Sequence, residues 1–155
     1  MGSIVVDDAH AALSLTEEST TLTVPADHAA YSKLLGLFEA ELKAQGLNSY
    51  KDIKDGDRSA VLRIPFWAWY DKRERVLDEL RPHRLDDTFK WSWPLIADIR
   101  HLCQAVVTAD GVEIMPPCPP IEKFPSFSEA GRRIYLTATL SDDSVLVTHL
   151  GLLHG

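Results

Sequence analysis

The chain has 155 residues, 45% hydrophobic and 25% charged, proportions that are ordinary for one soluble globular domain with a real core. No apolar run approaches the roughly 18 residues of a membrane span, and no signal peptide opens the chain. The net charge of -7 argues against strong autonomous binding to nucleic acid, because that affinity comes mainly from neutralising phosphates.

The first predicted element is a strand, Ile4–Val6, that runs directly into Asp7, Asp8 and His10. An apolar run followed at once by acids is typical of a buried parallel strand whose carboxyl end opens into a site. Carboxylates placed there can hold a magnesium ion, mostly through water, because magnesium takes oxygen ligands and dehydrates reluctantly. The alternative is structural: Asp7 or Asp8 caps a following helix, and His10 lies on its first turn.

The next part of the chain predicts a short strand followed by a helix. Thr20–Val24 alternates weakly, as a short strand does. Asp27 is then a good N-cap for a helix that continues to about Gln45 and stops at Gly46. The charged, glycine-containing segment 48–59 predicts a loop.

A second helix is expected after Pro65. Its predicted apolar face consists of Phe66, Trp69, Tyr70, Leu77 and Leu80. The segment is also the best candidate for nucleic-acid contact, since aromatic rings beside arginines can stack bases and hold phosphates. The candidate contact residues are Trp67, Trp69, Tyr70, Lys72, Arg73, Arg75, Arg81 and Arg84. Acidic residues interleave with these bases, so a solvated helix surface with internal ion pairs is the alternative.

Two short β-rich runs, 104–108 and 112–115, flank Ala109-Asp110-Gly111 and predict an antiparallel hairpin with a type I′ turn. The proline-rich segment 116–120 predicts an extended connector. Cys103 and Cys118 do not have the spacing of zinc ligands. Without a signal peptide, they predict free thiols in a reducing, cytoplasmic location.

A second apolar strand, 133–140, runs into the hydroxyls of Thr137 and Thr139. The segment Val5-Val6-Asp7-Asp8-Ala9-His10 resembles motif II, the Walker B box, of DEAD/DEAH-box helicases, with aspartate where the family usually has glutamate. Tyr135-Leu136-Thr137-Ala138-Thr139-Leu140 resembles their motif III, the Ser/Thr-Ala-Thr element. The two segments occur in the family's order within the first RecA-like domain. The resemblance therefore implies an α/β fold with a partial RecA-like parallel sheet.

The resemblance implies a role for each matched position. Asp7 would hold the magnesium of bound ATP. Asp8 would stand where the family's catalytic glutamate polarises the attacking water, with a side chain one methylene shorter, and positioning carries much of phosphoryl transfer. His10 would contact Thr137 and Thr139 and would link the nucleotide state to motion between the two helicase domains.

The resemblance also makes a structural prediction. The strands ending at Val6 and Leu136 should be parallel neighbours in one sheet, which would gather the five matched polar side chains at one edge. His10 should then reach a threonine hydroxyl directly or through one water. The predicted organisation is a single domain, 1–155, with RecA-like pieces at 1–15 and 124–155. Residues 16–123 would form a mostly helical insertion with one β-hairpin.

The sequence departs from the family in several ways, because the gap between the two motifs is far longer than usual and the chain stops soon after the second motif, without a second RecA-like domain. No G-x-x-x-x-G-K-[ST] loop occurs, and too few residues precede the first motif to carry that loop's strand and helix. We therefore expect a fragment of a helicase-type, nucleic-acid-dependent ATPase core that is inactive alone. The parent protein would bind ATP, Mg²⁺ and nucleic acid, whereas this chain alone would bind nucleic acid only weakly. The partner of this chain would be the rest of a helicase core or another protein.

Two alternatives stay open. The first is a freestanding protein-interaction module derived from a RecA-like fold, which would use the tryptophan-rich insertion as its surface. The second is a small metal-dependent hydrolase that uses Asp7, Asp8 and His10.

Overall fold

The computed structural model describes residues 2–136. It contains helices, one parallel pair of strands and one antiparallel sheet, so the predicted α/β class is confirmed. The described residues form two compact units. We call residues 2–20 with 118–136 the terminal unit, and Thr21–Pro117 the central unit, which covers most of the segment 16–123 that the sequence predicts as an insertion. Within residues 2–136, every helix is too short or too polar to span a lipid bilayer.

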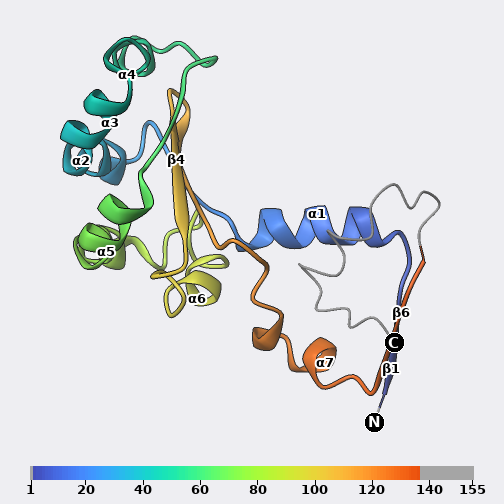
Figure 1. Ribbon diagram of the computed structural model, residues 1–155. Coiled ribbons are helices and arrows are strands. Elements are labelled where there is room, and N and C mark those ends of the chain that lie inside the picture. Colours follow the sequence, from blue (N-terminus) through green and yellow to red (C-terminus); the bar gives the residue numbers. More distant parts are fainter. Residues whose placement is uncertain (1, 137–155) are drawn as a thin grey trace. The chain divides into compact units, whose positions relative to one another are not determined.

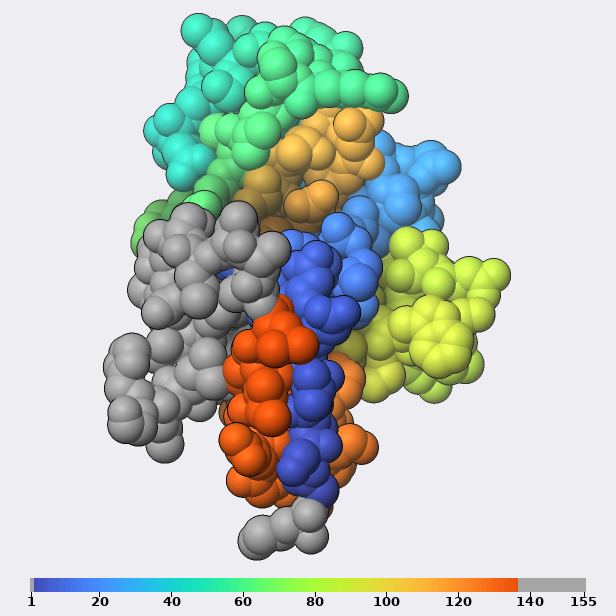
Figure 2. Space-filling view, turned by 90° about the vertical axis from the view of Figure 1, so that its right-hand side faces the viewer, coloured from blue at the N-terminus to red at the C-terminus, as the bar shows by residue number. Residues whose placement is uncertain are grey.

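The terminal unit is built on two parallel strands that are far apart in the sequence, β1 (Ser3–Val6) and β6 (Arg132–Tyr135). Ser3 lies opposite Arg132, and Val6 lies opposite Tyr135. Figures 1 and 2 both show the two strands side by side. The predicted parallel and adjacent pairing is confirmed, although β6 covers only the first part of the segment 133–140, and residues beyond 136 lie outside the described part of the chain.

Helix α1 (Ala9–Thr20) follows β1 after two residues. Its second half is rich in hydroxyl side chains, and these bond to the helix itself. Thr16, Ser19 and Thr20 donate to the carbonyl oxygens four residues earlier, at 2.7, 2.7 and 2.9 Å. These bonds satisfy the hydroxyls within the helix itself, although bonding of this kind slightly destabilises a helix and tends to bend it.

The core of the terminal unit is small. Ala9 and Leu13 of α1 are buried, and Phe127 and Tyr135 pack against them. Phe127 belongs to the short helix α7 (Pro125–Ser128), which follows the 3₁₀ turn η2 (Ile121–Lys123). Val5 is 59% exposed, so the expected burial of both faces of the first strand is wrong at this position.

The central unit contains a four-stranded antiparallel sheet with the strand order β2-β5-β4-β3. The strands are β2 (Leu22–Pro25), β3 (Val61–Arg63), β4 (Gln104–Thr108) and β5 (Gly111–Met115). The helices are α2 (Ala29–Leu37), α3 (Glu39–Gln45), α4 (Leu47–Lys54), α5 (Phe66–Leu80), η1 (Arg81–His83) and α6 (Trp93–Ile96). Helices α2 and α5 pack against each other and against the sheet (Figure 1).

Strands β4 and β5 form the predicted antiparallel hairpin. The predicted type I′ turn with Asp110-Gly111 at its centre is wrong, because that turn needs positive φ at both central residues and neither Asp110 nor Gly111 has it. The two residues between the strands are Ala109 and Asp110. The hydroxyl of Thr108 instead accepts the backbone N–H groups of Asp110 and Gly111, each at 3.2 Å. A side-chain oxygen thus satisfies the backbone donors of the turn, and no left-handed residue is required.

The helices after β2 differ from the predicted single helix with an Asp27 cap. His28 is the N-cap of α2, and the chain turns at Phe38 before α3 begins. Phe38 is 1% exposed, so core packing of this ring accompanies the break. The predicted loop at 48–59 is also wrong for its first half, which is α4. Its residues Tyr50 and Ile53 lie one turn apart and are both buried, which anchors the helix.

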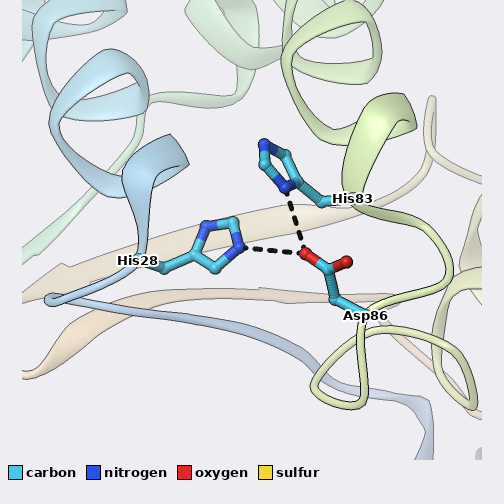
Figure 3. Close-up of side chains that lie close together, drawn as sticks. All are labelled: His28, His83 and Asp86. Atoms are coloured by element: carbon cyan, nitrogen blue, oxygen red, sulfur yellow. Dashed lines mark hydrogen bonds and ion pairs between the residues drawn. The ribbon is translucent and has the colours of Figure 1, made fainter.

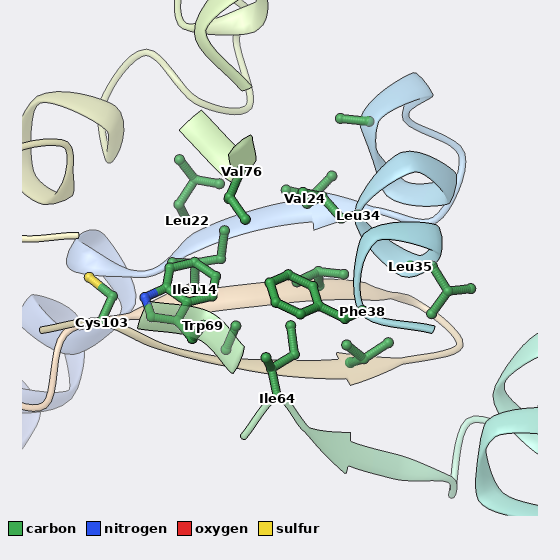
Figure 4. Close-up of a cluster of buried hydrophobic side chains, with 14 of the residues drawn as sticks. Leu22, Val24, Leu34, Leu35, Phe38, Ile64, Trp69, Val76, Cys103 and Ile114 are labelled. Carbon is green, nitrogen blue, oxygen red and sulfur yellow. The ribbon is translucent and has the colours of Figure 1, made fainter. Parts of the chain in front are cut away.

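The core of the central unit lies between the sheet and helices α2 and α5 (Figure 4). The rings of Phe38 and Trp69 are stacked with centroids 6.2 Å apart and planes 14° apart. Alternate residues of β4 are buried, as expected for a strand with one covered face. Side chains that line this core in Figure 4 include Leu22, Val24, Leu34, Leu35, Ile64, Val76, Cys103 and Ile114.

Helix α5 begins after Pro65 as predicted, but its inward face is rotated from the expected one. Ala68 and Trp69 are both buried at its start, so the face is centred between them. Residues 66 and 70 therefore point outward, and Phe66 and Tyr70 are 62% and 50% exposed. The prediction that these two aromatic residues belong to the core is wrong.

Candidate functional site

The predicted acidic site lies at the carboxyl end of β1. Asp7 and Asp8 follow Val6 directly, and both are exposed. Asp8 has a φ of 50°, the left-handed region, and it is the one non-glycine residue with positive φ among residues 2–136. Aspartate tolerates this conformation better than most residues, at a cost of about 1–2 kcal/mol. Such backbone outliers concentrate at functional sites, although they do not by themselves identify one.

Asp8 also has a structural task. Its Oδ1 accepts the backbone N–H of Ala11 at 3.1 Å, which is the hydrogen bond of an N-cap. The structure thus contains the cap that the sequence offers as the alternative to a catalytic role. A carboxylate in this position is fixed at the strand end, and its second oxygen is the one that could act on a water or a hydrated cation.

His10 is half-buried on the first turn of α1. The neighbouring strand end comes close to this turn, because Leu136 N donates to Val6 O and Ala9 N donates to Leu136 O, both at 2.9 Å. The structure therefore brings the end of β6 next to Asp7, Asp8 and His10. Thr137 and Thr139, the two predicted hydroxyl partners of His10, lie outside the described residues.

The second predicted site, the nucleic-acid surface of α5, is assembled only in part. Trp69 is 2% exposed and its Nε1 donates to the carbonyl oxygen of Arg100 at 2.9 Å, so it cannot stack on a base. Lys72 pairs with Glu41 and donates to the carbonyl oxygen of Leu37 at 2.9 Å. That ion pair lowers the pKa of the Glu41 carboxyl, chiefly through the hydrogen bond from Lys72. The prediction that Trp69 and Lys72 contact nucleic acid is wrong.

Of the other predicted contact residues, Arg75 of α5 and Arg81 and Arg84 after it are exposed. Helix α5 also has an exposed aromatic surface, defined here as Phe66, Trp67 and Tyr70. The rings of Phe66 and Tyr70 have centroids 6.2 Å apart. The guanidinium of Arg73 lies 4.0 Å from the centre of the Tyr70 ring, a cation–π contact. This surface is apolar, with one charge that is already engaged by a ring.

A third group of side chains was not found from the sequence. His28, His83 and Asp86 converge in the central unit (Figure 3). His83 Nδ1 lies 3.0 Å and His28 Nε2 lies 3.5 Å from the same oxygen, Asp86 Oδ2. The spacing of His83 and Asp86, three residues apart, is a weak local signal. Nothing in the sequence points to His28, which lies 55 residues before His83 and is brought there by the fold.

Neither a family model, nor a curated protein, nor a solved structure matches this chain at a significant level. Any assignment of function therefore depends on the residues and the geometry described above.

Proposed function

We propose that this chain carries the motif II and motif III edge of a helicase-type ATPase core. The observation that carries the proposal is the parallel pairing of β1 and β6. Two segments more than 120 residues apart pair in the orientation that the resemblance requires, with their carboxyl ends together. In open α/β sheets, ligands bind at the carboxyl ends of parallel strands.

The placement of the acids supports the same proposal. Asp7 is exposed directly after the strand, where it can contact a hydrated Mg²⁺. Asp8 is held by its cap bond to Ala11 in a left-handed conformation beside it. In this proposal Asp7 holds the magnesium of ATP, Asp8 orients the attacking water, and His10 transmits the nucleotide state through Thr137 and Thr139. Phosphate binding requires a loop that this sequence does not contain, so the chain alone is inactive.

Two measurements test this proposal. The encoding DNA upstream of Met1 should contain an in-frame G-K-[ST] loop, and an in-frame stop codon close to Met1 would contradict the helicase fragment. The purified chain should have no Mg²⁺-dependent ATP turnover. Turnover that is lost in Asp7→Asn would refute the statement that the chain is inactive alone.

The exposed aromatic surface favours a second candidate, a protein-interaction module. Phe66, Trp67 and Tyr70 present rings to solvent, and aromatic residues of this kind are enriched at protein interfaces. The net charge of -7 opposes binding to nucleic acid. Fluorescence anisotropy with single-stranded DNA should therefore give weak binding that disappears at physiological salt. Binding that resists salt and falls in Trp67→Ala, but not in Trp91→Ala, would instead make this surface a nucleic-acid site. Trp91, 76% exposed against 66% for Trp67, is the control tryptophan elsewhere in the central unit.

A further inference from the structure

The cluster of His28, His83 and Asp86 has the chemistry of a transition-metal site. Two imidazole nitrogens and one carboxylate oxygen lie within 4.8 Å of one another. Imidazole nitrogen with a single carboxylate suits zinc and its neighbours, whereas magnesium and calcium prefer sets made only of oxygen. Catalytic zinc sites likewise have three protein ligands and a fourth position that is occupied by water or substrate.

The distances are close to those of a bound ion. Zinc ligands lie about 2.0–2.2 Å from the metal, so two ligands of a tetrahedral site are about 3.3 Å apart. The distances from Asp86 Oδ2 to His83 Nδ1 and His28 Nε2, 3.0 and 3.5 Å, lie on either side of that value. The two nitrogens also lie within 4.8 Å of each other.

The surrounding structure holds the three side chains in place. The backbone N–H of Asp86 donates to the carbonyl oxygen of His83 at 2.8 Å, and the Asp86 carbonyl oxygen accepts from the N–H groups of Phe89 and Lys90, both at 2.9 Å. The ring of Phe89, which is fully buried, packs edge-on against His28 with centroids 4.9 Å apart. The side chains of His28, His83 and Asp86 are 16%, 28% and 47% exposed, which leaves an approach for a hydrated ion.

His28 has a second bond that decides how a metal could bind. Its Nδ1 accepts the backbone N–H of Ala30 at 3.1 Å, and this bond caps helix α2. An accepting Nδ1 carries no proton, so in the neutral ring the proton is on Nε2 and points at Asp86. A metal needs the lone pair of Nε2, and the proton must then move to Nδ1, where it faces the N–H of Ala30. Metal binding and the helix cap therefore compete for the same imidazole.

We propose that His28, His83 and Asp86 form a binding site for zinc or a similar divalent transition metal, and that metal binding releases the His28 cap of α2. Zinc takes Nε2 of His28, Nδ1 of His83 and Oδ2 of Asp86. The N–H of Ala30 then loses its side-chain acceptor, and the first turn of α2 becomes less protected. The site would couple metal concentration to the stability of one helix end.

Zinc titration of the full chain by isothermal calorimetry tests the site, with Co²⁺ absorption as a report of tetrahedral coordination. The wild type should bind one zinc ion, and His83→Gln and Asp86→Asn should each weaken binding by about tenfold or more. His101→Gln is the matched control, because it removes an exposed histidine of the same unit outside the cluster and should bind as the wild type does. Equal affinity in wild type and His83→Gln, or no zinc binding by the wild type at millimolar concentration, would overturn the site.

The cap exchange has its own readout, hydrogen exchange at the amide of Ala30. Zinc should speed this exchange in the wild type. In His28→Asn, asparagine supplies a good N-cap but no metal nitrogen, so zinc should bind weakly and leave the exchange unchanged. Zinc binding to the wild type that leaves the Ala30 amide equally protected would overturn the competition between metal and cap.

Discussion

Gly111 is the position where one added methyl group should disturb the central sheet most. It begins β5 and lies opposite Pro25 of β2. A Cβ built there would lie 2.5 Å from the carbonyl oxygen of Val24 and 3.3 Å from Pro25 Cα. Nonbonded heavy atoms are most favourable at about 3.5–4.0 Å, and these contacts are to backbone, which has no alternative rotamer. In Gly111→Ala, strand β2 must therefore move away from β5.

The magnitude follows from two opposing contributions. Overpacking of this kind costs about 1–3 kcal/mol. Alanine also has less conformational freedom than glycine in the unfolded chain, which raises the free energy of unfolding by about 0.4–1 kcal/mol. The 2.5 Å contact to a backbone oxygen places the cost of overpacking in the upper part of its range, about 2–3 kcal/mol. The free energy of unfolding should thus fall by about 1–2.6 kcal/mol, which lowers the melting temperature of a unit of this size by about 5–20 °C.

Gly36→Ala is the matched control for this experiment. Gly36 lies inside α2, its φ is not positive, and an added Cβ would meet no atom within 4 Å. Alanine is a better helix former than glycine, so this variant should gain about 0.5–1 kcal/mol. Urea unfolding followed by circular dichroism measures both variants. Equal stability changes in the two variants, or a stable Gly111→Ala protein, would refute the argument that backbone contact at Gly111 sets the spacing of β2 and β5.

Two further predictions concern buried side chains of the central unit. Trp69→Ala should lower the free energy of unfolding by about 3–5 kcal/mol, because it leaves a cavity in the core and leaves the Arg100 carbonyl oxygen without its indole donor. The exposed control Trp67→Ala should change it by less than about 0.5 kcal/mol. Similar losses in both variants, measured by urea unfolding, would contradict the assigned helix face. Burial raises the pKa of the Cys103 thiol to about 12. The native state therefore keeps this proton where the unfolded chain has lost it, so stability falls as pH rises above about 9, and Cys103→Ala should reduce that loss. A thiol reagent at pH 8 should label the half-buried Cys118 first and Cys103 only on unfolding, and rapid labelling of both thiols in the native protein would contradict the burial of Cys103.

Local sequence signals were sufficient for several elements. The hairpin β4–β5 is encoded by two short β-rich runs around a turn, and its partners are adjacent in the sequence. The start of α5 after Pro65 also follows from residues next to it, since proline is compatible with the first turn of a helix but not with its interior. The pairing of β1 with β6 is different, because it was predicted from a resemblance between motifs and not from any local pattern.

Other features depend on contacts that a local pattern does not contain. The inward face of α5 depends on which side chains fit under α2 and the sheet, and Trp69 fills that space while Phe66 and Tyr70 do not. The hairpin turn is closed by the Thr108 hydroxyl, so the Asp-Gly sequence did not decide its type. Helical periodicity predicted one helix where the burial of Phe38 accompanies a break into two.

The sequence alone therefore determined the α/β class, the hairpin and the acidic end of the first strand. The sequence also offered Asp7 or Asp8 as the cap of the first helix, and the structure assigns that cap to Asp8 in a left-handed conformation. Tertiary structure alone decided that His28 meets His83 and Asp86. The physical reason is the range of the interactions. Periodicity, caps and turns act over a few residues and can be read along the chain. A site whose ligands come from the N-cap of α2 and from the segment 83–86 after α5 exists only after packing has brought the two segments together.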